Sequence, residues 1–250
     1  MHPILTTLAQ TTSPPTGDLW GLFTQSFDAF TVMLITGSLY AAAVIVRNAL
    51  DVRPKAILPQ RELERAASLV EHARWGELRE FVKTESTFIG AVLRPAIAEA
   101  HRGREAMEDA AEMAASSETA RWFRKIEPLN IVGNLGPLVG LAGTVWGMIL
   151  AFTSLGATGG QAGPTELSEG ISKALFHTLL GLLLAIPCLL VFGFYRSMID
   201  RLCTRAITET ARLVGHIPAG DECPDALISE KHRERRGAAS AKRPGAPSAA

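Results

Sequence analysis

Three long stretches of the sequence contain no Asp, Glu, Lys or Arg, and they constrain the fold more than any other feature. They are residues 29–46, 128–165 and 174–195 of a chain of 250 residues. The hydrocarbon core of a bilayer, about 30 Å thick, is crossed by a helix of about 20 apolar residues. The sequence therefore predicts an all-α integral membrane protein with three transmembrane helices, at 27–46, 128–155 and 174–195.

The basic residues fall almost entirely on one side of these predicted spans. Residues 47–127 hold 14 of the 25 Lys and Arg residues and residues 196–250 hold 10, whereas segment 156–173 holds only Lys173. Lys and Arg are enriched in cytoplasmic loops. The pattern predicts an outside, periplasmic N-terminal segment (1–26), an outside loop (156–173) and a cytoplasmic C-terminus. The net charge of zero argues against a nucleic-acid-binding protein, which usually has a basic excess.

Residues 47–127 carry helical patterns and are predicted to form a cytoplasmic helical domain. An amphipathic stripe runs from Gln60 to Glu85, and a second helical stretch runs from Phe88 to Glu127, with Pro95 as a kink or a new start. Pro128 suits the first turn of the helix of the second span, because proline lacks the N–H that a first turn leaves unpaired.

The third predicted span is expected to continue past the membrane. Apolar residues recur as far as His216, so a helix from Glu166 to His216 would be about 75 Å long at about 1.5 Å per residue. We expect a cytoplasmic helical extension over 196–228. Residues 229–250 are charged and then rich in Ala, Pro, Gly and Ser, a composition typical of a disordered tail.

The sequence lacks the common motifs of enzymes and metal sites. We find no GxSxG, HExxH or GxxxxGK[ST] motif. The three cysteines form no CxxC pair and no Cys/His cluster with zinc spacing. We therefore expect no enzymatic activity, no metal and no cofactor.

Small residues recur along the second predicted span. Glycines at spacings of three and four lie on one face of a helix, and small residues allow close helix packing in lipid. The third span carries a matching face around Thr178, which includes Gly181. These patterns predict a tightly packed helix pair, whose candidate helix-packing residues are Gly136, Gly140, Gly143, Gly147 and Gly181.

Five polar residues in or beside the second and third spans are candidate site residues. Thr144 either bonds its own backbone or faces an interior or pore, and Thr178 lies on the small-residue face. His177 is either a proton-carrying group or a neutral hydrogen-bonding group between helices. Lys173 and Glu169 are spaced to form an ion pair at the outer surface, the simplest interpretation of both.

The two glycine-rich spans resemble the MotA/TolQ/ExbB proton channel family, most closely its ExbB/TolQ branch. The resemblance is carried by Gly140-Leu-Ala-Gly-Thr-Val-Trp-Gly147, by Gly170-Ile-Ser-Lys-Ala-Leu175, and by Thr178, Gly181 and Ala185-Ile-Pro187. It covers residues 128–195 at the level of sequence, and the rest of the chain agrees in layout.

The resemblance implies a homo-oligomer, usually described as a pentamer, around a pore lined by the second and third spans. A single-span partner of the ExbD/TolR type is expected inside the pore, and a TonB- or TolA-like protein as a further partner. Proton flow would then energise transport or envelope processes at the outer membrane from a multi-pass protein of the bacterial inner membrane. Thr144 and Thr178 fall where the family keeps pore-lining threonines.

The sequence departs from the family pattern at one position. The branch often has a glutamate shortly before the second threonine, and this chain has Lys173 there. Because the three uncharged runs contain no carboxylate, we expect the partner helix to supply it, with Thr144 and Thr178 as uncharged relays. The alternative function is a structural membrane scaffold that does not conduct protons.

Overall fold

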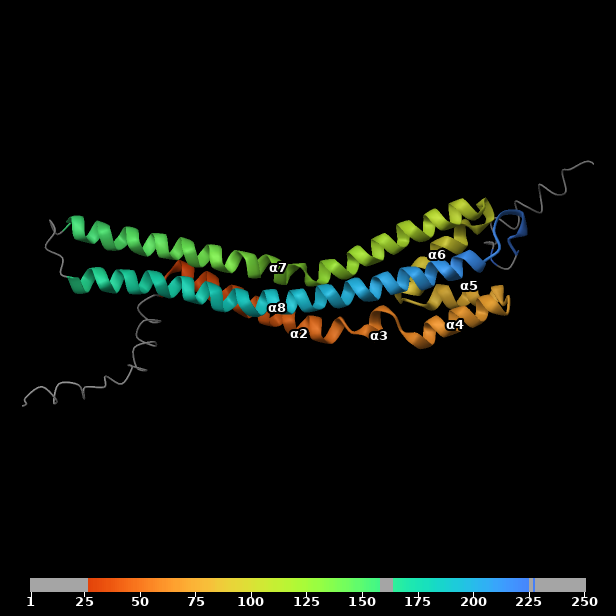
Figure 1. Cartoon of the computed structure of the whole chain (residues 1–250), viewed down its shortest axis with the longest axis horizontal. Coiled ribbons are helices and arrows are strands. Elements are labelled where there is room, and N and C mark those ends of the chain that lie inside the picture. Colours follow the sequence, from red (N-terminus) through yellow and green to blue (C-terminus); the bar gives the residue numbers. More distant parts are fainter. Residues whose placement is uncertain (1–26, 158–163, 225–226, 228–250) are drawn as a thin grey trace, which may run out of the picture. The chain divides into compact units, whose positions relative to one another are not determined.

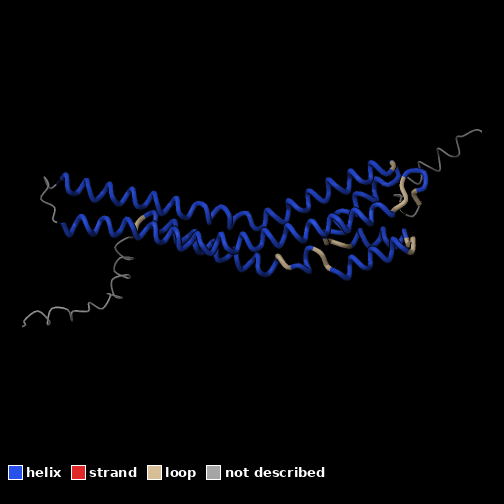
Figure 2. Tube along the Cα trace, viewed as in Figure 1, coloured by secondary structure: helices blue, strands red, loops and turns tan. Residues whose placement is uncertain are grey.

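The computed structural model describes residues 27–157, 164–224 and 227, and these residues contain helices but no strand (Figures 1 and 2). Three helices are long and apolar enough to cross a membrane: α2 (Ala29–Asp51), α7 (Arg104–Ala157) and α8 (Pro164–His216). The predicted all-α membrane fold is confirmed. The predicted N-terminal segment 1–26 and tail 229–250 lie outside the described residues.

The chain divides into two compact units. Among the described residues, the membrane unit comprises 27–45, 128–157 and 164–192, and the helical unit comprises 46–127, 193–224 and 227. The divisions fall inside α2, α7 and α8, so each long helix contributes one part to each unit.

The membrane unit has a small core and a largely apolar exposed surface. Its buried residues Ala41, Leu129 and Cys188 come from α2, α7 and α8 and are surrounded by partly buried apolar side chains. Large apolar residues elsewhere point outward, as Leu39 and Leu190 do with 69% of each exposed. A surface of this kind suits contact with lipid or with other membrane helices.

The helical unit builds its core from short helices packed with the long ones. The short helices are α3 (Pro54–Ile57), α4 (Gln60–Glu71), α5 (Trp75–Thr84) and α6 (Phe88–Glu99), with the 3₁₀ turns η1 (Ala100–Arg102) and η2 (Gly220–Glu222). Phe88, Leu78, Met107 and Ile199 are fully buried. The apolar stripes of α4 and α5 therefore face a common interior, as amphipathic helices require.

The amphipathic stretch expected from Gln60 to Glu85 is two helices instead of one. Ala73 adopts a left-handed φ of 53° and ends α4. The N–H of Ala73 donates to the carbonyl of Val70, and the N–H of Arg74 donates to the carbonyl of Leu69. These two bonds form a Schellman cap, which usually has glycine at the position of Ala73, so the break is hard to predict from the residues alone.

The next helices also begin and end at other residues than predicted. Pro95 lies inside α6, and the break comes at Gly103, whose φ of 114° suits glycine. Helix α7 starts at Arg104 and passes through Pro128. Pro128 is therefore inside a helix and not in its first turn, because the Ala- and Glu-rich residues before it continue the helix into the span.

The segment predicted as an outside loop, 156–173, is helical over much of its length. Helix α7 ends at Ala157 and α8 begins at Pro164. Proline is favoured at the start of a helix, where its fixed φ already suits helical geometry. At its other end α8 reaches His216, the residue to which the apolar pattern extends.

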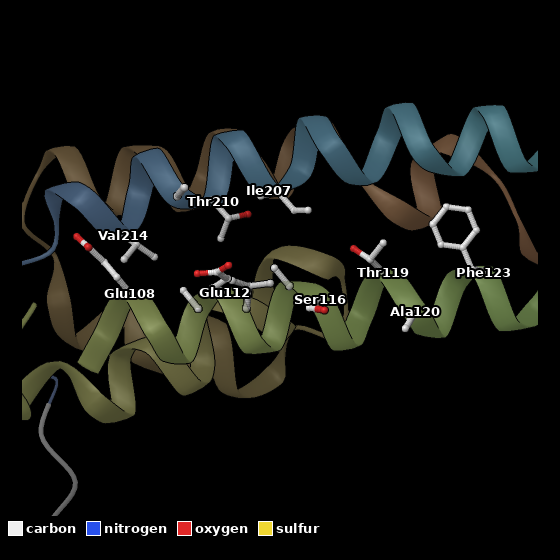
Figure 3. Close-up of a pocket in the computed structure, with 13 residues that line it drawn as sticks. Glu108, Glu112, Ser116, Thr119, Ala120, Phe123, Ile207, Thr210 and Val214 are labelled. Carbon is white, nitrogen blue, oxygen red and sulfur yellow. The ribbon is translucent and has the colours of Figure 1, made fainter. Parts of the chain in front are cut away.

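A cavity of about 850 Å³ lies in the helical unit between α7 and α8 (Figure 3). Its walls are mainly apolar, with Phe123, Ile207 and Val214 among them. The carboxylates of Glu108 and Glu112 line the same cavity, and Glu108 lies 3.7 Å from a guanidinium nitrogen of Arg104. No group of three metal-ligand side chains occurs anywhere in the described part of the chain.

Candidate ion-pathway site

The membrane parts of α7 and α8 approach each other until their backbones touch. A Cβ added to Gly140 would lie 2.8 Å from the carbonyl oxygen of His177 and 3.0 Å from the Cα of Thr178. A Cβ added to Gly181 would lie 2.6 Å from the carbonyl oxygen of Gly136. No side chain fits at either position, so glycine itself sets the distance between the helices.

The other predicted packing glycines lie along the same contact. A Cβ on Gly143 would lie 2.8 Å from both Cβ and Cγ of His177, and one on Gly147 would lie 3.0 Å from the Cβ of Ala174. The space beside Gly143 is therefore occupied by the imidazole of His177, which a larger residue on α7 would displace.

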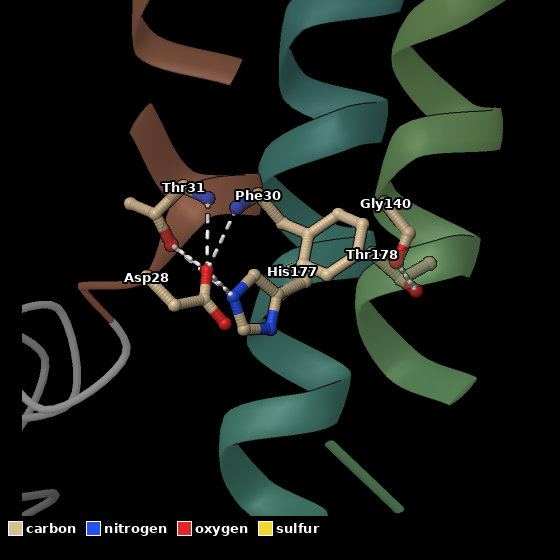
Figure 4. A network of polar contacts seen from close by, with 6 residues as sticks. All are labelled: Asp28, Phe30, Thr31, Gly140, His177 and Thr178. Carbon is tan, nitrogen blue, oxygen red and sulfur yellow. Dashed lines mark hydrogen bonds and ion pairs between the residues drawn. The ribbon is translucent and has the colours of Figure 1, made fainter. Parts of the chain in front are cut away.

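The two predicted threonines, Thr144 on α7 and Thr178 on α8, make different hydrogen bonds. The Thr178 hydroxyl donates across the interface to the carbonyl oxygen of Gly140, at 3.3 Å (Figure 4). The buried Thr144 hydroxyl donates to the carbonyl of Leu141 in its own helix, at 2.6 Å. Thr144 thus adopts the backbone-bonded arrangement that the sequence left open, and Thr178 joins α8 to α7.

His177 is 2% exposed and bonds to the start of α2. Its Nε2 lies 3.0 Å from Oδ1 of Asp28 and 3.2 Å from the hydroxyl of Thr31 (Figure 4). The same Asp28 oxygen accepts the backbone N–H groups of Phe30 and Thr31, at 3.0 and 3.1 Å. Asp28 therefore caps the N-terminus of α2 and holds the His177 ring at the same time.

Lys173 and Glu169 pair with each other one turn before His177. Their Nζ and Oε1 atoms are 2.9 Å apart, and the side chains are 32% and 45% exposed. Glu169 therefore offsets the charge of Lys173 near the surface of the unit.

The structure thus brings together Thr178, His177 and the packing glycines, and adds two residues that sequence reasoning had not chosen. These two residues are Asp28 and Thr31, which lie at the start of the first predicted span, 27–46. The sequence feature that could have pointed to them is His177, because a histidine within an uncharged run needs a polar partner in lipid. The sequence alone could not show how far α2 is shifted along α8.

These features define a class of membrane protein whose helices are built around a close, polar-lined contact, not a simple lipid anchor. The chain belongs to the MotA/TolQ/ExbB proton channel family, whose model matches residues 82–207. The matched range includes both glycine-rich segments and all five polar site residues predicted from the sequence. Family membership and the three apolar helices together make the chain a multi-pass inner-membrane protein.

Individual relatives support the same family. The chain is 34% identical over 156 residues to the putative biopolymer transport protein ExbB-like 1 of Synechocystis sp., covering 62% of this chain and 55% of that protein. It is 30% identical over 168 residues to the biopolymer transport protein exbB1 of Vibrio cholerae, covering 67% and 70%. It is 35% identical over 104 residues to the Tol-Pal system protein TolQ of Pseudomonas aeruginosa, covering 42% and 45%.

The chain therefore spans about half of the Synechocystis and Pseudomonas relatives and more than two thirds of the Vibrio relative. The family description names proton channels and no enzymatic activity.

Proposed function

We propose that this chain is the channel-type subunit of a complex that uses the proton gradient across the inner membrane to energise transport or envelope processes at the outer membrane. The observation that carries the proposal is the α7–α8 contact, where glycines bring the backbones together and the Thr178 hydroxyl bonds to Gly140. Two helices held this closely, with a hydroxyl group bonded across their contact, suit one wall of a narrow polar pathway.

The proposed assembly is a homo-oligomer, a pentamer in its simplest form. The outward-facing apolar side chains of the membrane unit give each copy a surface for neighbouring copies as well as for lipid. A single-span ExbD/TolR-like protein is the proposed partner inside the ring, with a TonB- or TolA-like protein as the component that receives the motion. The names of the relatives in Vibrio and Pseudomonas support this class of complex.

The proposed orientation places the N-terminus outside and the C-terminus in the cytoplasm. It rests on the basic residues, of which 24 of 25 lie in the segments between the first two spans and after the third. In this orientation Asp28 and the Lys173–Glu169 pair lie toward the outside, where protons enter under the normal gradient.

The partner is proposed to bring the carboxylate that carries protons through the middle of the membrane. The described part of α7 from 128 to 157 contains no titratable Asp, Glu, Lys or His, and α8 from 178 to 195 contains none either. A hydroxyl can relay a proton but does not hold a charge at neutral pH. This subunit without its partner is therefore expected not to translocate protons.

The experiment is co-purification followed by reconstitution. The tagged chain is expressed with a single-span membrane protein encoded beside it, and the purified complex is placed in liposomes with a pH-sensitive dye. We expect the partner to co-purify and proton flux to require it. Flux from the subunit alone would overturn the proposal that the partner supplies the carboxylate. A stable oligomer that never conducts with any partner would favour the scaffold alternative.

A further inference from the structure

Asp28 caps α2 and also bonds to His177. Both residues lie in the membrane unit, one at the start of α2 and one inside α8, and their side chains meet at 3.0 Å (Figure 4). An ionisable pair inside a membrane helix bundle is costly to bury and marks a functional site by default. Capping α2 needs only a short polar side chain and would not need a buried histidine.

Asp28 determines which nitrogen of His177 carries the proton. An ionised carboxylate only accepts hydrogen bonds, so the Nε2 that faces Asp28 Oδ1 is the N–H donor. In the neutral ring the proton-accepting lone pair then lies on Nδ1. Nδ1 is buried and has no hydrogen-bond partner among the described residues. In this tautomer Nδ1 is the one ring nitrogen of neutral His177 that can accept a proton.

The two members of the pair differ in exposure. The Asp28 side chain is 37% exposed, whereas His177 is 2% exposed, so the pair joins a partly exposed carboxylate to a buried ring. His177 follows Lys173 by four residues, or about 6 Å along the helix. The ring packs against Gly143 on α7, and the next residue of α8, Thr178, bonds to Gly140.

Few other charged groups act on the pair. On α8 the nearest are Lys173 and Glu169, which neutralise each other at 2.9 Å. On α7 the stretch that faces His177, residues 136–151, contains no Asp, Glu, Lys, Arg or His, and on α2 the residues from 29 to 46 contain none either. The charge of Asp28 is therefore the main local field on the imidazole.

We propose that Asp28 and His177 form a proton-loading site in this subunit, on the outer side of the pathway that α7 and α8 line. The site takes up one proton from outside water, the new N–H bond forms at His177 Nδ1, and the net charge of the pair goes from −1 to zero. The loaded proton then lies beside the Gly140–Thr178 contact. This inference rests on the proposed function for its role in transport, but the proton-binding site itself is defined by the pair alone.

The first test observes the proton on the ring directly. The full-length chain, labelled with ¹⁵N-histidine and assembled with its partner in lipid nanodiscs, is followed by NMR across about pH 5–8. We expect the Nδ1 signal of His177, assigned by its loss in His177→Gln, to change from unprotonated to protonated as the pH falls while Nε2 stays protonated. A Nδ1 signal that stays in one state over this range would overturn the proposal.

The second variant separates the pair from the helix cap. Asn caps helices about as well as Asp but carries no charge, so Asp28→Asn keeps α2 intact. It is expected to reduce the protonated fraction of His177 at each pH, because the negative charge that favours imidazolium is gone. His72→Gln removes an exposed histidine that directly follows α4 and is expected to leave the His177 titration unchanged. An unchanged titration in Asp28→Asn would show that the two residues do not act as a pair.

Proton flux through the same complex in liposomes tests the role in transport. We expect His177→Gln to lower the flux by about 100-fold, the scale of a lost proton-transfer group, and Asp28→Asn to move the pH profile of the flux to lower pH. Wild-type flux in His177→Gln would overturn the loading role. If the wild-type complex conducts no protons and the ring still titrates, the proposed function fails and the proton-binding site stands.

Discussion

Gly181 of α8 lies so close to Gly136 of α7 that a β-carbon on Gly181 would come within 2.6 Å of the Gly136 carbonyl oxygen. The neighbouring atom is backbone and cannot rotate away as a side chain would. Gly181→Ala should therefore push the two helices apart and break the Thr178–Gly140 bond nearby. We expect a loss of about 1–3 kcal/mol, the usual cost of overpacking, measured by thermal unfolding of the purified chain in detergent.

Gly193→Ala is the matched control for this prediction. Gly193 lies in the same helix, and a Cβ there would meet no atom within 4 Å. Alanine favours helix over glycine by up to about 1 kcal/mol, so this variant should be as stable as the wild type or slightly more so. Equal losses in the two variants would show that the close approach at Gly181 does not set the stability.

The sequence predicted the small-residue face of α7 because its glycines recur at helical spacing, and spacing alone places them on one side. It could not predict the Asp28–His177 bond, which joins residues 149 positions apart. That bond depends on how far α2 is shifted along α8, and three uniformly apolar helices can slide past one another with little change in burial. The end of α4 at Ala73 was also hidden, because alanine is a strong helix former.

Cys203 should react slowly with alkylating reagents. It lies in the helical unit outside the predicted spans, it is 2% exposed, and burial raises the pKa of its thiol. The thiolate is the reactive form, so a raised pKa leaves less of it at any given pH, and the rate should keep rising with pH beyond the range of an ordinary thiol. In a Cys188→Ser, Cys223→Ser background, we expect labelling at about pH 8 to be about tenfold slower than for an exposed thiol.

The reference for this rate is an exposed thiol on the same helix. Ser197→Cys, with all three native cysteines replaced by serine, places a thiol at an exposed position of α8. Mass spectrometry of the alkylated chain over time measures both rates. Equal rates at Cys203 and at position 197 would mean that this part of α8 is not packed as described.

Arg104 should stabilise the helical unit by joining the start of α7 to the end of α8. Its two terminal nitrogens donate to the carbonyl oxygens of Val214 and Ile217, at 3.3 and 2.9 Å. The last carbonyls of a helix lack partners within the helix. The Arg104 side chain is 46% exposed, so Arg104→Ala should cost about 1 kcal/mol, less than a fully buried charged hydrogen bond. Arg104→Lys should recover only part of the lost stability, because lysine lacks the planar guanidinium that donates to both carbonyls.

Arg102→Ala provides the comparison for Arg104. Arg102 is two residues earlier and pairs with Glu99 of the preceding turn, at 2.9 Å between two exposed side chains. Exposed pairs of this kind contribute little, so its loss should leave the denaturation midpoint unchanged. Chemical denaturation followed by circular dichroism measures both variants, and a larger loss for Arg102→Ala than for Arg104→Ala would contradict the assignment.

Replacing Thr178 by valine separates a packing role from a proton-relay role, because valine has nearly the same shape and lacks the hydroxyl. Thr178→Val should keep the oligomer intact and abolish most proton flux, whereas Thr178→Ser keeps the hydroxyl that bonds to Gly140 and should conduct. Thr144→Ala should also reduce flux without preventing assembly, although its hydroxyl bonds within α7. Size-exclusion chromatography and flux in liposomes are measured on the same samples. Wild-type flux in a Thr178→Val, Thr144→Ala double variant would show that neither hydroxyl takes part in proton transfer. Loss of assembly in Thr178→Val would show that Thr178 has a packing role instead.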